Sequence, residues 1–146
     1  MKQGKGTSAD PILAAGAVIW RKGKEGPEFL LLQNADHHGW GFAKGHLKKH
    51  ENLSVGACRE ILEETGLSIA PANFGVGFAD AALYETKPNV WKRTVHFLVE
   101  ADLAFEVKIS AEHNQAIWAG LAQALALVEH DKLRRTLHRA AYVVVA

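Results

Sequence analysis

The sequence predicts an α/β (α+β) domain in which helices pack over a mixed β-sheet. Apolar segments of strand length alternate with helical segments, and further helical segments end the chain. A length of 146 residues fits a single domain, residues 1–146, that can bury a sizeable core. The 48% hydrophobic and 23% charged residues lie near the globular average, so global disorder is excluded.

Two strands are expected near the N-terminus, after a polar leader over residues 1–11 that we expect to be flexible. The first is the apolar run Ala14–Trp20, and the second is Glu28–Gln33, beyond a turn-rich segment. The longer apolar run Ile12–Trp20 could imitate a signal-peptide core, but basic residues follow it and no small-residue cleavage site is evident. No apolar stretch approaches the roughly 18 residues that a membrane span needs.

Residues 34–50 predict mostly loop, because three glycines interrupt them and no hydrophobic period persists. A helix is expected from Asn52 or Leu53 to Thr65, with Gly66 as a left-handed C-terminal cap. Helical spacing puts three glutamates on one side of this helix. The opposite side, expected to face the sheet, carries Val55, Cys58, Ile61 and Leu62.

The second half of the chain predicts three more strands and two helices. The strands are expected at Phe74–Tyr84, Trp91–Ala101 and about Ala116–Trp118. The helices are expected at Leu121–Val128 and Asp131–Tyr142. The second of these helices carries basic side chains at positions expected to face solvent, namely Lys132, Arg134, Arg135 and Arg139.

Charge and cysteine content narrow the possible classes of binding partner and of structural cross-link. The 17 Lys and Arg balance 16 Asp and Glu, and the net charge of +1 removes the electrostatic argument for non-specific nucleic-acid or membrane-surface binding. Cys58 is the single cysteine, so it forms no internal disulfide and argues against a structural zinc cluster. We expect an inert core thiol and a cytoplasmic location.

The helix predicted around residue 60 carries a cluster of carboxylates. Glu60, Glu63 and Glu64 fall within an arc of about 100° on its surface. Carboxylate-rich, oxygen-only ligation suits Mg²⁺ or Mn²⁺ rather than zinc. On its own this spacing favours a solvated glutamate-rich face, and the flanking residues reverse that interpretation.

Those flanking residues complete a longer motif, G-x5-E-x7-R-E-U-x-E-E-x-G-U, in which U is aliphatic. All of its specified positions are filled, by Gly45, Glu51, Arg59, Glu60, Ile61, Glu63, Glu64, Gly66 and Leu67. This motif is the Nudix box, and the chain therefore resembles the Nudix hydrolases. The resemblance implies a Nudix α/β/α sandwich with a mixed β-sheet between helices.

The same resemblance implies roles for the motif residues. Glu60, Glu63 and Glu64 match glutamates that bind Mg²⁺, for which Mn²⁺ could substitute, and the Lys44 carbonyl is a further candidate ligand. Either Glu60 or a glutamate further along would act as base for the attacking water. The candidates for catalysis within the box are thus Glu60, Glu64, Arg59 and Glu51, the last two of which could instead only brace the loop against the helix.

Segments outside the box resemble the asymmetrically cleaving, animal-like branch of the diadenosine tetraphosphate hydrolases. Residues 37–46 are similar to that branch's W-x-x-P-K-G-H, and Ser110–Trp118 is similar to its S-x-E-H-x-x-x-x-W. Tyr84, with the Lys-Pro pair that follows it, resembles its tyrosine and K-P loop. Glu112 then matches a glutamate that joins the metal site or acts as base.

This closer resemblance implies a surface for a polyphosphate and a base. Tyr84 could stack on an adenine or could serve only as a core or rim aromatic. The candidates for contacting the phosphate chain are Lys44, His46, His38, Lys92 and Arg93. Because Lys92 and Arg93 alternate along a predicted strand, only one of them is expected to face the site.

Two departures from the branch pattern surround the box. Ala43 replaces the proline usual before Lys-Gly, which loosens the loop entering the metal site. A basic Lys-Lys-His run over 48–50 replaces an acidic-Pro-Gly turn, which could favour a long anionic substrate or change only a surface. Both departures leave the predicted metal ligands intact.

The expected function is Mg²⁺-dependent hydrolysis of a dinucleoside polyphosphate, chiefly diadenosine tetraphosphate to ATP and AMP, with water as nucleophile. The box fixes the chemistry and not the bound groups, so a nucleoside triphosphate, a nucleotide sugar or an RNA 5′ end stays open as substrate. A non-catalytic nucleotide-binding module is a further alternative, against which the three intact glutamates argue. The sequence identifies no protein partner and gives no reason to expect a membrane partner.

Overall fold

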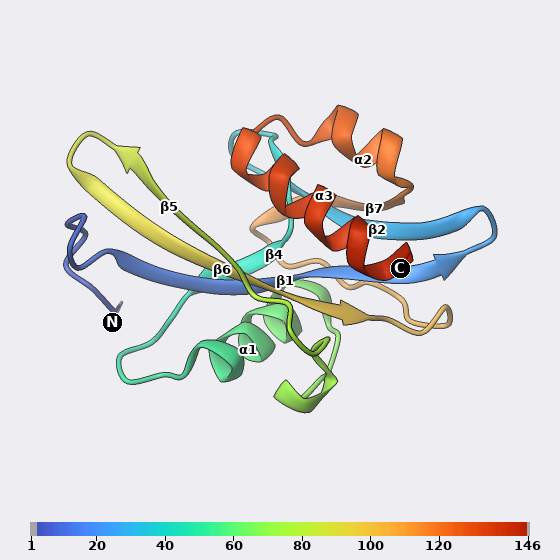
Figure 1. The fold of residues 1–146 in the computed structure, drawn as a ribbon, viewed down its shortest axis with the longest axis horizontal. Helices are drawn as coiled ribbons and strands as arrows, with labels where there is room; N and C mark the ends of the chain where they lie inside the picture. Colours follow the sequence, from blue (N-terminus) through green and yellow to red (C-terminus); the bar gives the residue numbers. More distant parts are fainter. Residues whose placement is uncertain (1–2, 146) are drawn as a thin grey trace.

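The computed structural model describes residues 3–145 and shows a mixed sheet between two helical layers. Helix α1 (Leu53–Thr65) covers one face of the sheet, and α2 (Leu121–Leu127) with α3 (Asp131–Val145) covers the other (Figure 1). The predicted α/β sandwich is confirmed. Within the described residues, no helix is long and apolar enough to cross a membrane.

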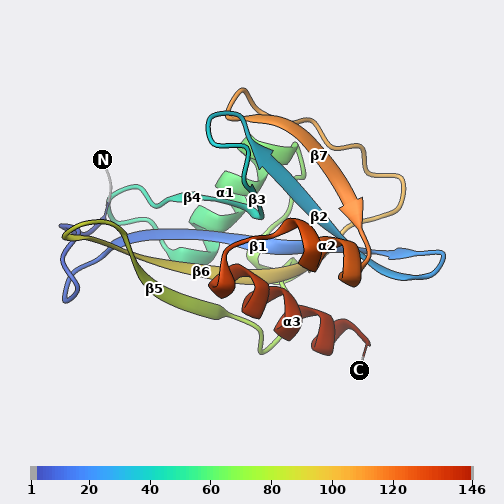
Figure 2. The same cartoon turned by 90° about the horizontal axis from the view of Figure 1, so that it is seen from above.

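The sheet is built around two parallel neighbours, β1 and β6, with every other pairing antiparallel. Its strand order is β3-β2-β1-β6-β5, with β4 added beside β1 and β7 beside β2, as the view from above shows (Figure 2). The strands are β1 (Ile12–Gly23), β2 (Gly26–Asn34), β3 (Trp40–Gly41), β4 (Ala43–His46), β5 (Asp80–Lys87), β6 (Val90–Glu100) and β7 (His113–Ala119).

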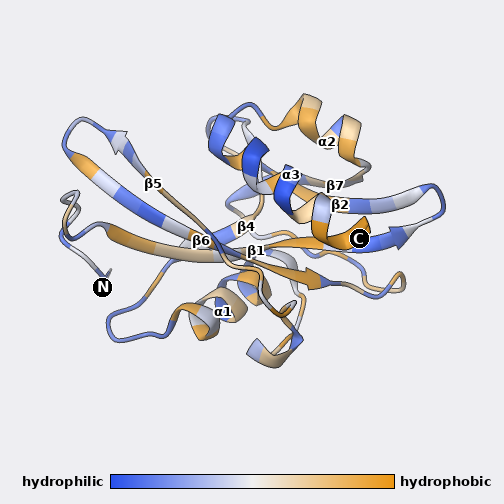
Figure 3. Ribbon diagram, viewed as in Figure 1, coloured by the Kyte–Doolittle hydropathy of each residue, from blue (hydrophilic) through white to orange (hydrophobic). Residues whose placement is uncertain are grey.

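Strand β1 is apolar throughout its centre because helices cover both of its faces. Val18 belongs to the core cluster beneath α2 and α3, whereas its neighbour Ile19 belongs to the cluster beneath α1. Alternate side chains of one strand thus fill two separate cores. In Figure 3 the hydrophobic colour accordingly concentrates in the middle of β1 and fades toward the exposed β1–β2 turn.

Helix α1 begins and ends where the sequence predicts. The Asn52 side chain accepts a hydrogen bond from the Ser54 amide at the N-terminus. Gly66 adopts the left-handed conformation, with φ of 80°, and its amide donates to the Leu62 carbonyl. A residue without a Cβ adopts this conformation at the least cost, so the glycine ends the helix here.

The buried face of α1 differs from the prediction. Ala57, Ile61 and Glu64 are buried, whereas Val55 and Leu62 are about half exposed, at 51% and 49%. The helix is turned so that Glu64 reaches the edge strand β4, and this turn carries the two aliphatic side chains outward. Cys58, expected in the core, is a free thiol that is only half-buried.

Two predicted segments in the middle of the chain were wrong in extent. The strand expected at Phe74–Tyr84 begins only at Asp80, since a short 3₁₀ helix η1 (Pro71–Asn73) and Gly77, with φ of 81°, interrupt the extended chain. The segment 34–50, expected to be mostly loop, contains β3 and β4. These short strands form because the edges of β2 and β1 offer them backbone partners.

The basic face of α3 is not the solvated surface predicted for it. Lys132 donates to the Leu83 carbonyl, Arg134 donates to carbonyls of the α2 turn, and Arg139 pairs with the buried Asp80. Arg135 is exposed as predicted. The basic side chains therefore fasten α3 to β5 and α2.

The described part of the N-terminal leader is tied to the sheet and to the loop before α1. The amide of Gln3 donates to the Leu47 carbonyl, and its side-chain amide donates to the carbonyls of Lys48 and Glu51, each at 2.7 Å. Further along, the Trp91 amide donates to the Gly6 carbonyl. These hydrogen bonds hold the leader against the segment that enters the helix.

Candidate functional site

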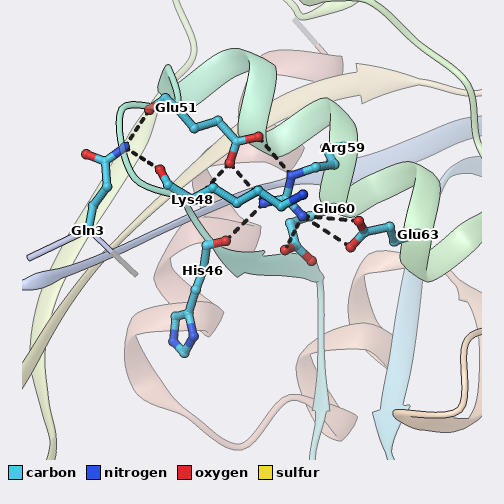
Figure 4. A network of polar contacts seen from close by, with 7 residues as sticks. All are labelled: Gln3, His46, Lys48, Glu51, Arg59, Glu60 and Glu63. Atoms are coloured by element: carbon cyan, nitrogen blue, oxygen red, sulfur yellow. Dashed lines mark hydrogen bonds and ion pairs between the residues drawn. The ribbon is translucent and has the colours of Figure 1, made fainter. Parts of the chain in front are cut away.

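An arginine on α1 holds the loop between β4 and α1 in place. Arg59 donates two hydrogen bonds to the Glu51 carboxylate, at 2.8 and 2.9 Å, and a third to the His46 carbonyl at 3.1 Å (Figure 4). Glu51 also accepts the Lys48 amide at 2.9 Å. The paired guanidinium lowers the pKa of Glu51 to about 2. The geometry matches the bracing expectation for this pair.

The same guanidinium extends toward the glutamates of the box. Its Nη1 lies 2.9 Å from an oxygen of Glu60 and 3.2 Å from an oxygen of Glu63. The Glu60 side chain is only 13% exposed, whereas Glu63 is 54% exposed. Arg59 therefore links the loop to two of the predicted metal ligands, one sheltered and one open to solvent.

Glu64 is the most buried carboxylate of the site, at 5% exposed. One of its oxygens accepts the Lys44 amide of β4 at 3.0 Å. Burial, with smaller contributions from the charges of Glu60 and Glu112, raises its pKa to about 8. Burial likewise raises the pKa of Glu60, although Arg59 opposes the shift. For these two sheltered carboxylates, burial therefore outweighs the positive charges of Arg59 and Lys44.

Glu112 belongs to this electrostatic neighbourhood although it lies far along the chain. It is exposed just before β7, and its carbonyl accepts the Ala35 amide. Its charge contributes to the raised pKa of both Glu60 and Glu64. The fold therefore brings Glu112 within electrostatic reach of Glu60 and Glu64.

The chemistry of this donor set fits a hard divalent cation. In proteins, Mg²⁺ and Mn²⁺ bind mainly to oxygen ligands. Two of the oxygen ligands here are sheltered carboxylates whose negative charges repel one another, and a bound cation would relieve this repulsion. In the side-chain arrangement of residues 3–145, no three acidic, histidine or cysteine groups converge as a formed metal cluster. Arg59 instead contacts Glu60 and Glu63, and Glu64 holds the Lys44 amide.

A cavity of about 450 Å³ has Lys44, whose amide binds Glu64, as part of its wall. Its rim combines aromatic rings with histidines from four parts of the chain. The lining residues are Leu32, Asn34, His37, Gly39, Trp40, Gly41, Phe42, Lys44, Tyr84, His113, Glu129, His130 and Leu133. A space of this size and character suits a planar heterocycle with charged groups attached.

Only part of the predicted substrate surface reaches this cavity. Lys44 and Tyr84 line it, whereas His38 does not, because a turn with φ of 60° at His38 leaves its neighbour His37 on the cavity side. His46 is half-buried outside the cavity wall, and its carbonyl accepts Arg59.

Strand register settles the choice between the two basic residues of β6. Lys92 pairs with Tyr84 across β5 and β6, so both side chains lie on the sheet face covered by α3. Arg93 pairs with Leu83 and is exposed on the opposite face. Lys92 is therefore the residue that shares the cavity's side of the sheet.

Sequence reasoning missed the three histidines of the cavity, His37, His113 and His130. His130 lies in the turn between α2 and α3, and its ring centroid is 5.6 Å from that of Tyr84. Its position in the chain carries no signal, since only the packing of α3 over β5 brings it there. His113 directly follows Glu112 within the motif segment Ser110–Trp118, and burial lowers its pKa.

The NUDIX domain family matches residues 10–140, nearly the whole chain. The chain belongs to the Nudix family. The mouse asymmetrical bis(5'-nucleosyl)-tetraphosphatase is 33% identical over 134 residues, covering 86% of this chain and 90% of the mouse protein, and its rat counterpart is 35% identical with the same coverage. A crystal structure of a Caenorhabditis elegans Ap4A hydrolase binary complex superposes with a TM-score of 0.83 at 26% identity, covering 91% and 97% of the two chains.

These comparisons agree with the geometry of the site. The Nudix match spans the loop, helix α1 and all four predicted acidic ligands. The similarity to the tetraphosphatases extends beyond the box, over most of both chains.

Proposed function

We propose that this Nudix protein hydrolyses a dinucleoside polyphosphate, diadenosine tetraphosphate in particular, to ATP and AMP with the help of Mg²⁺. The observation that carries the proposal is the double position of Lys44. The backbone amide of Lys44 donates a hydrogen bond to Glu64 of the carboxylate cluster. Lys44 also lines the aromatic cavity. A base held in that cavity would therefore extend its phosphates toward the carboxylates. The mouse and rat relatives are named asymmetrical bis(5'-nucleosyl)-tetraphosphatases, which supports a substrate of this class.

The reaction is a substitution at phosphorus by water. A new bond forms between the water oxygen and a phosphorus of the chain, a phosphoanhydride bond to that phosphorus breaks, and the released phosphate oxygen leaves with ATP or AMP. The proton lost by the water passes to a carboxylate of the cluster. Glu60, Glu63, Glu64, Glu112 and the Lys44 carbonyl would hold Mg²⁺, which would supply positive charge for the phosphates and a lower pKa for the attacking water.

The remaining side chains bind and orient the substrate. Lys44 and Lys92 stabilise charge on the phosphates without giving up protons. Tyr84 and His130 present aromatic faces to a base, which contribute about 1–3 kcal/mol per stacked base. The Glu51–Arg59 pair keeps the loop and the helix in register, so that the cluster stays beside the cavity.

Incubation with diadenosine tetraphosphate and Mg²⁺, followed by chromatography of the products, tests the proposal. We expect equal amounts of ATP and AMP, and no turnover after removal of the metal with a chelator. Two molecules of ADP per substrate, or no turnover with Mg²⁺ present, would contradict the proposal. Nucleoside triphosphates, nucleotide sugars and a 5′-triphosphorylated RNA, assayed in parallel, decide whether another substrate is preferred.

Two substitutions test the carboxylate cluster. Glu60→Gln and Glu64→Gln keep the size of each side chain and remove its charge, so we expect turnover to fall by about 100-fold or more while the fold is retained. Glu25→Gln, at an exposed turn, is the matched control and should retain wild-type turnover. Near wild-type activity in both cluster variants would refute the assignment of these glutamates.

A further inference from the structure

A small second cavity lies behind the wall of the larger one, between β5, β6 and α3. Its volume is about 40 Å³, room for about three water-sized groups. Lys44, Tyr84, His130 and Leu133 line both cavities, so the small one continues the large one inward. We name it the inner chamber, and its other lining residues are Ala82, Thr94, His96, Lys132 and Thr136.

The inner chamber contains a buried imidazole that has no polar partner among the described residues. His96 is 1% exposed, and neither of its ring nitrogens has a hydrogen-bond partner there. Its ring packs edge-on against Phe42, with centroids 5.4 Å apart. Buried polar atoms in folded proteins almost always find a partner, so a residue with two unmatched nitrogens at a cavity points to a polar occupant.

Several other polar groups around His96 already have hydrogen-bond partners. The Tyr84 hydroxyl and Thr94 Oγ1 lie 3.0 Å apart in a hydrogen bond. Asp80, which faces His96 across the strand pair, accepts from Thr136 and Arg139. Lys132 donates to the Leu83 carbonyl. His96 differs from these groups, because neither of its ring nitrogens has a partner among the described residues.

Burial lowers the pKa of His96 to about 3, with the nearby Lys44 charge acting in the same direction and Asp80 opposing it. The imidazole is consequently neutral at any physiological pH. A neutral imidazole presents one N–H donor and one bare nitrogen acceptor. An exocyclic amino group, which donates, matches the bare nitrogen.

We propose that His96 is a specificity-determining residue, which accepts a hydrogen bond from the 6-amino group of an adenine whose ring lies against Tyr84. This proposal rests on the proposed function, which places an adenine nucleotide in the larger cavity. The base enters past the shared residues Tyr84 and His130, and its polar edge fills the inner chamber. A site that hydrogen-bonds a substrate group rejects analogues that lack the group, because its own buried atom is then left unmatched.

Equilibrium binding of two nucleotides measures this preference without any need for turnover. AMP and purine riboside 5′-monophosphate differ only in the 6-amino group, and the dissociation constant of each is measured by calorimetry. We expect the wild-type protein to bind AMP about tenfold more tightly or better. His96→Leu should bind both nucleotides within twofold of each other, through a loss for AMP alone, and His96→Gln should keep part of the preference because its carbonyl accepts a hydrogen bond.

Controls separate a lost contact from a lost fold. His138→Leu changes an exposed histidine on α3 outside the chamber and should keep the wild-type ratio. Thermal unfolding of each variant checks that the fold persists. A wild-type ratio near one, or a tenfold ratio that survives in His96→Leu, would overturn the proposal and leave the chamber to water.

Turnover of diadenosine tetraphosphate on the same preparations distinguishes the two proposals. Turnover without an AMP preference would contradict the proposed role of His96 and support the proposed function. An AMP preference that depends on His96, without turnover, would support the proposed role of His96 and contradict the proposed function.

Discussion

The carboxylate of Glu60 occupies the space in which a side chain at position 45 would lie. A Cβ placed on Gly45 would come within 2.1 Å of the Glu60 Cδ and Oε2 atoms, far closer than van der Waals contact. The φ of Gly45 is not positive, so the backbone conformation does not require a glycine there. The first residue of the Nudix box is thus a glycine because a proposed metal ligand fills the space.

Gly45→Ala should impair hydrolysis far more than it impairs folding. The clashing atoms are the end of a flexible side chain, which can swing aside, so we expect a stability loss of only about 1 kcal/mol. The displaced Glu60 carboxylate would no longer meet its partners, and turnover should fall by about 100-fold. Urea unfolding and the Mg²⁺-dependent assay, run on one preparation, measure both effects.

Alanine substitutions at two other glycines serve as controls for Gly45→Ala. Gly120→Ala places its methyl group in open space, so we expect only small changes in stability and in turnover. Gly16→Ala would put its methyl 1.9 Å from the Ala43 carbonyl, which is backbone and cannot swing aside, so this variant should unfold. Full activity in Gly45→Ala would show that the Glu60 position is not critical.

The sequence was sufficient for the elements whose signals are local. The period and the Gly66 cap located α1, and the box spacing located the glutamates that the fold then gathers. The sequence was insufficient where a contact with a residue distant in the chain decides which side chain is buried. Hydrophobicity alone places Leu62 in the core, yet the Lys44 amide of β4 draws Glu64 inward and turns Leu62 out.

The cavity shows the same limit more strongly. Tyr84 was identified through a short motif, but His130, its aromatic neighbour, comes from a turn that no periodicity marks. His96 sits in an ordinary apolar strand pattern, in which a buried histidine cannot be told from a half-exposed one. Such residues become visible only when the packing of α3 over β5 and β6 is known.

Replacement of the two adjacent basic residues of β6 should have unequal effects. Lys92 shares the sheet face of Tyr84, whereas Arg93 lies on the other face. Lys92→Ala should therefore raise KM by about tenfold through a lost phosphate contact, and Arg93→Ala should stay within about twofold of wild type. Steady-state kinetics with diadenosine tetraphosphate measure this difference. Equal losses in the two variants would disprove the assignment by register.

Glu51→Gln should remove part of the protein's sensitivity to acid. The folded pKa of Glu51, about 2, lies below its ordinary value of 4.5, so the Arg59 pair stabilises the fold fully above pH 4.5 and loses this effect as pH falls toward 2. The variant lacks the charge at every pH, and it should be about 2 kcal/mol less stable at pH 7. The difference from wild type should shrink below pH 4.5.

Urea midpoints between pH 2.5 and pH 7 measure the convergence of these two proteins. Glu25→Gln is again the control, because an exposed glutamate at a turn should leave the whole curve unchanged. A gap between wild type and Glu51→Gln that stayed constant down to pH 2.5 would mean that the carboxylate charge is not the source of the stabilisation.

His96 should destabilise the fold at mildly acidic pH, in a higher window than Glu51. Its folded pKa of about 3 lies below the ordinary 6.5, so between these values the unfolded chain binds a proton that the folded chain does not. Stability is therefore lost as pH falls from 6.5 toward 3, at up to about 1.4 kcal/mol per pH unit. His96→Leu cannot bind that proton in either state, so its unfolding free energy should vary less over this window. Parallel curves for the two proteins between pH 6.5 and 4 would show that His96 titrates alike in the folded and unfolded chains.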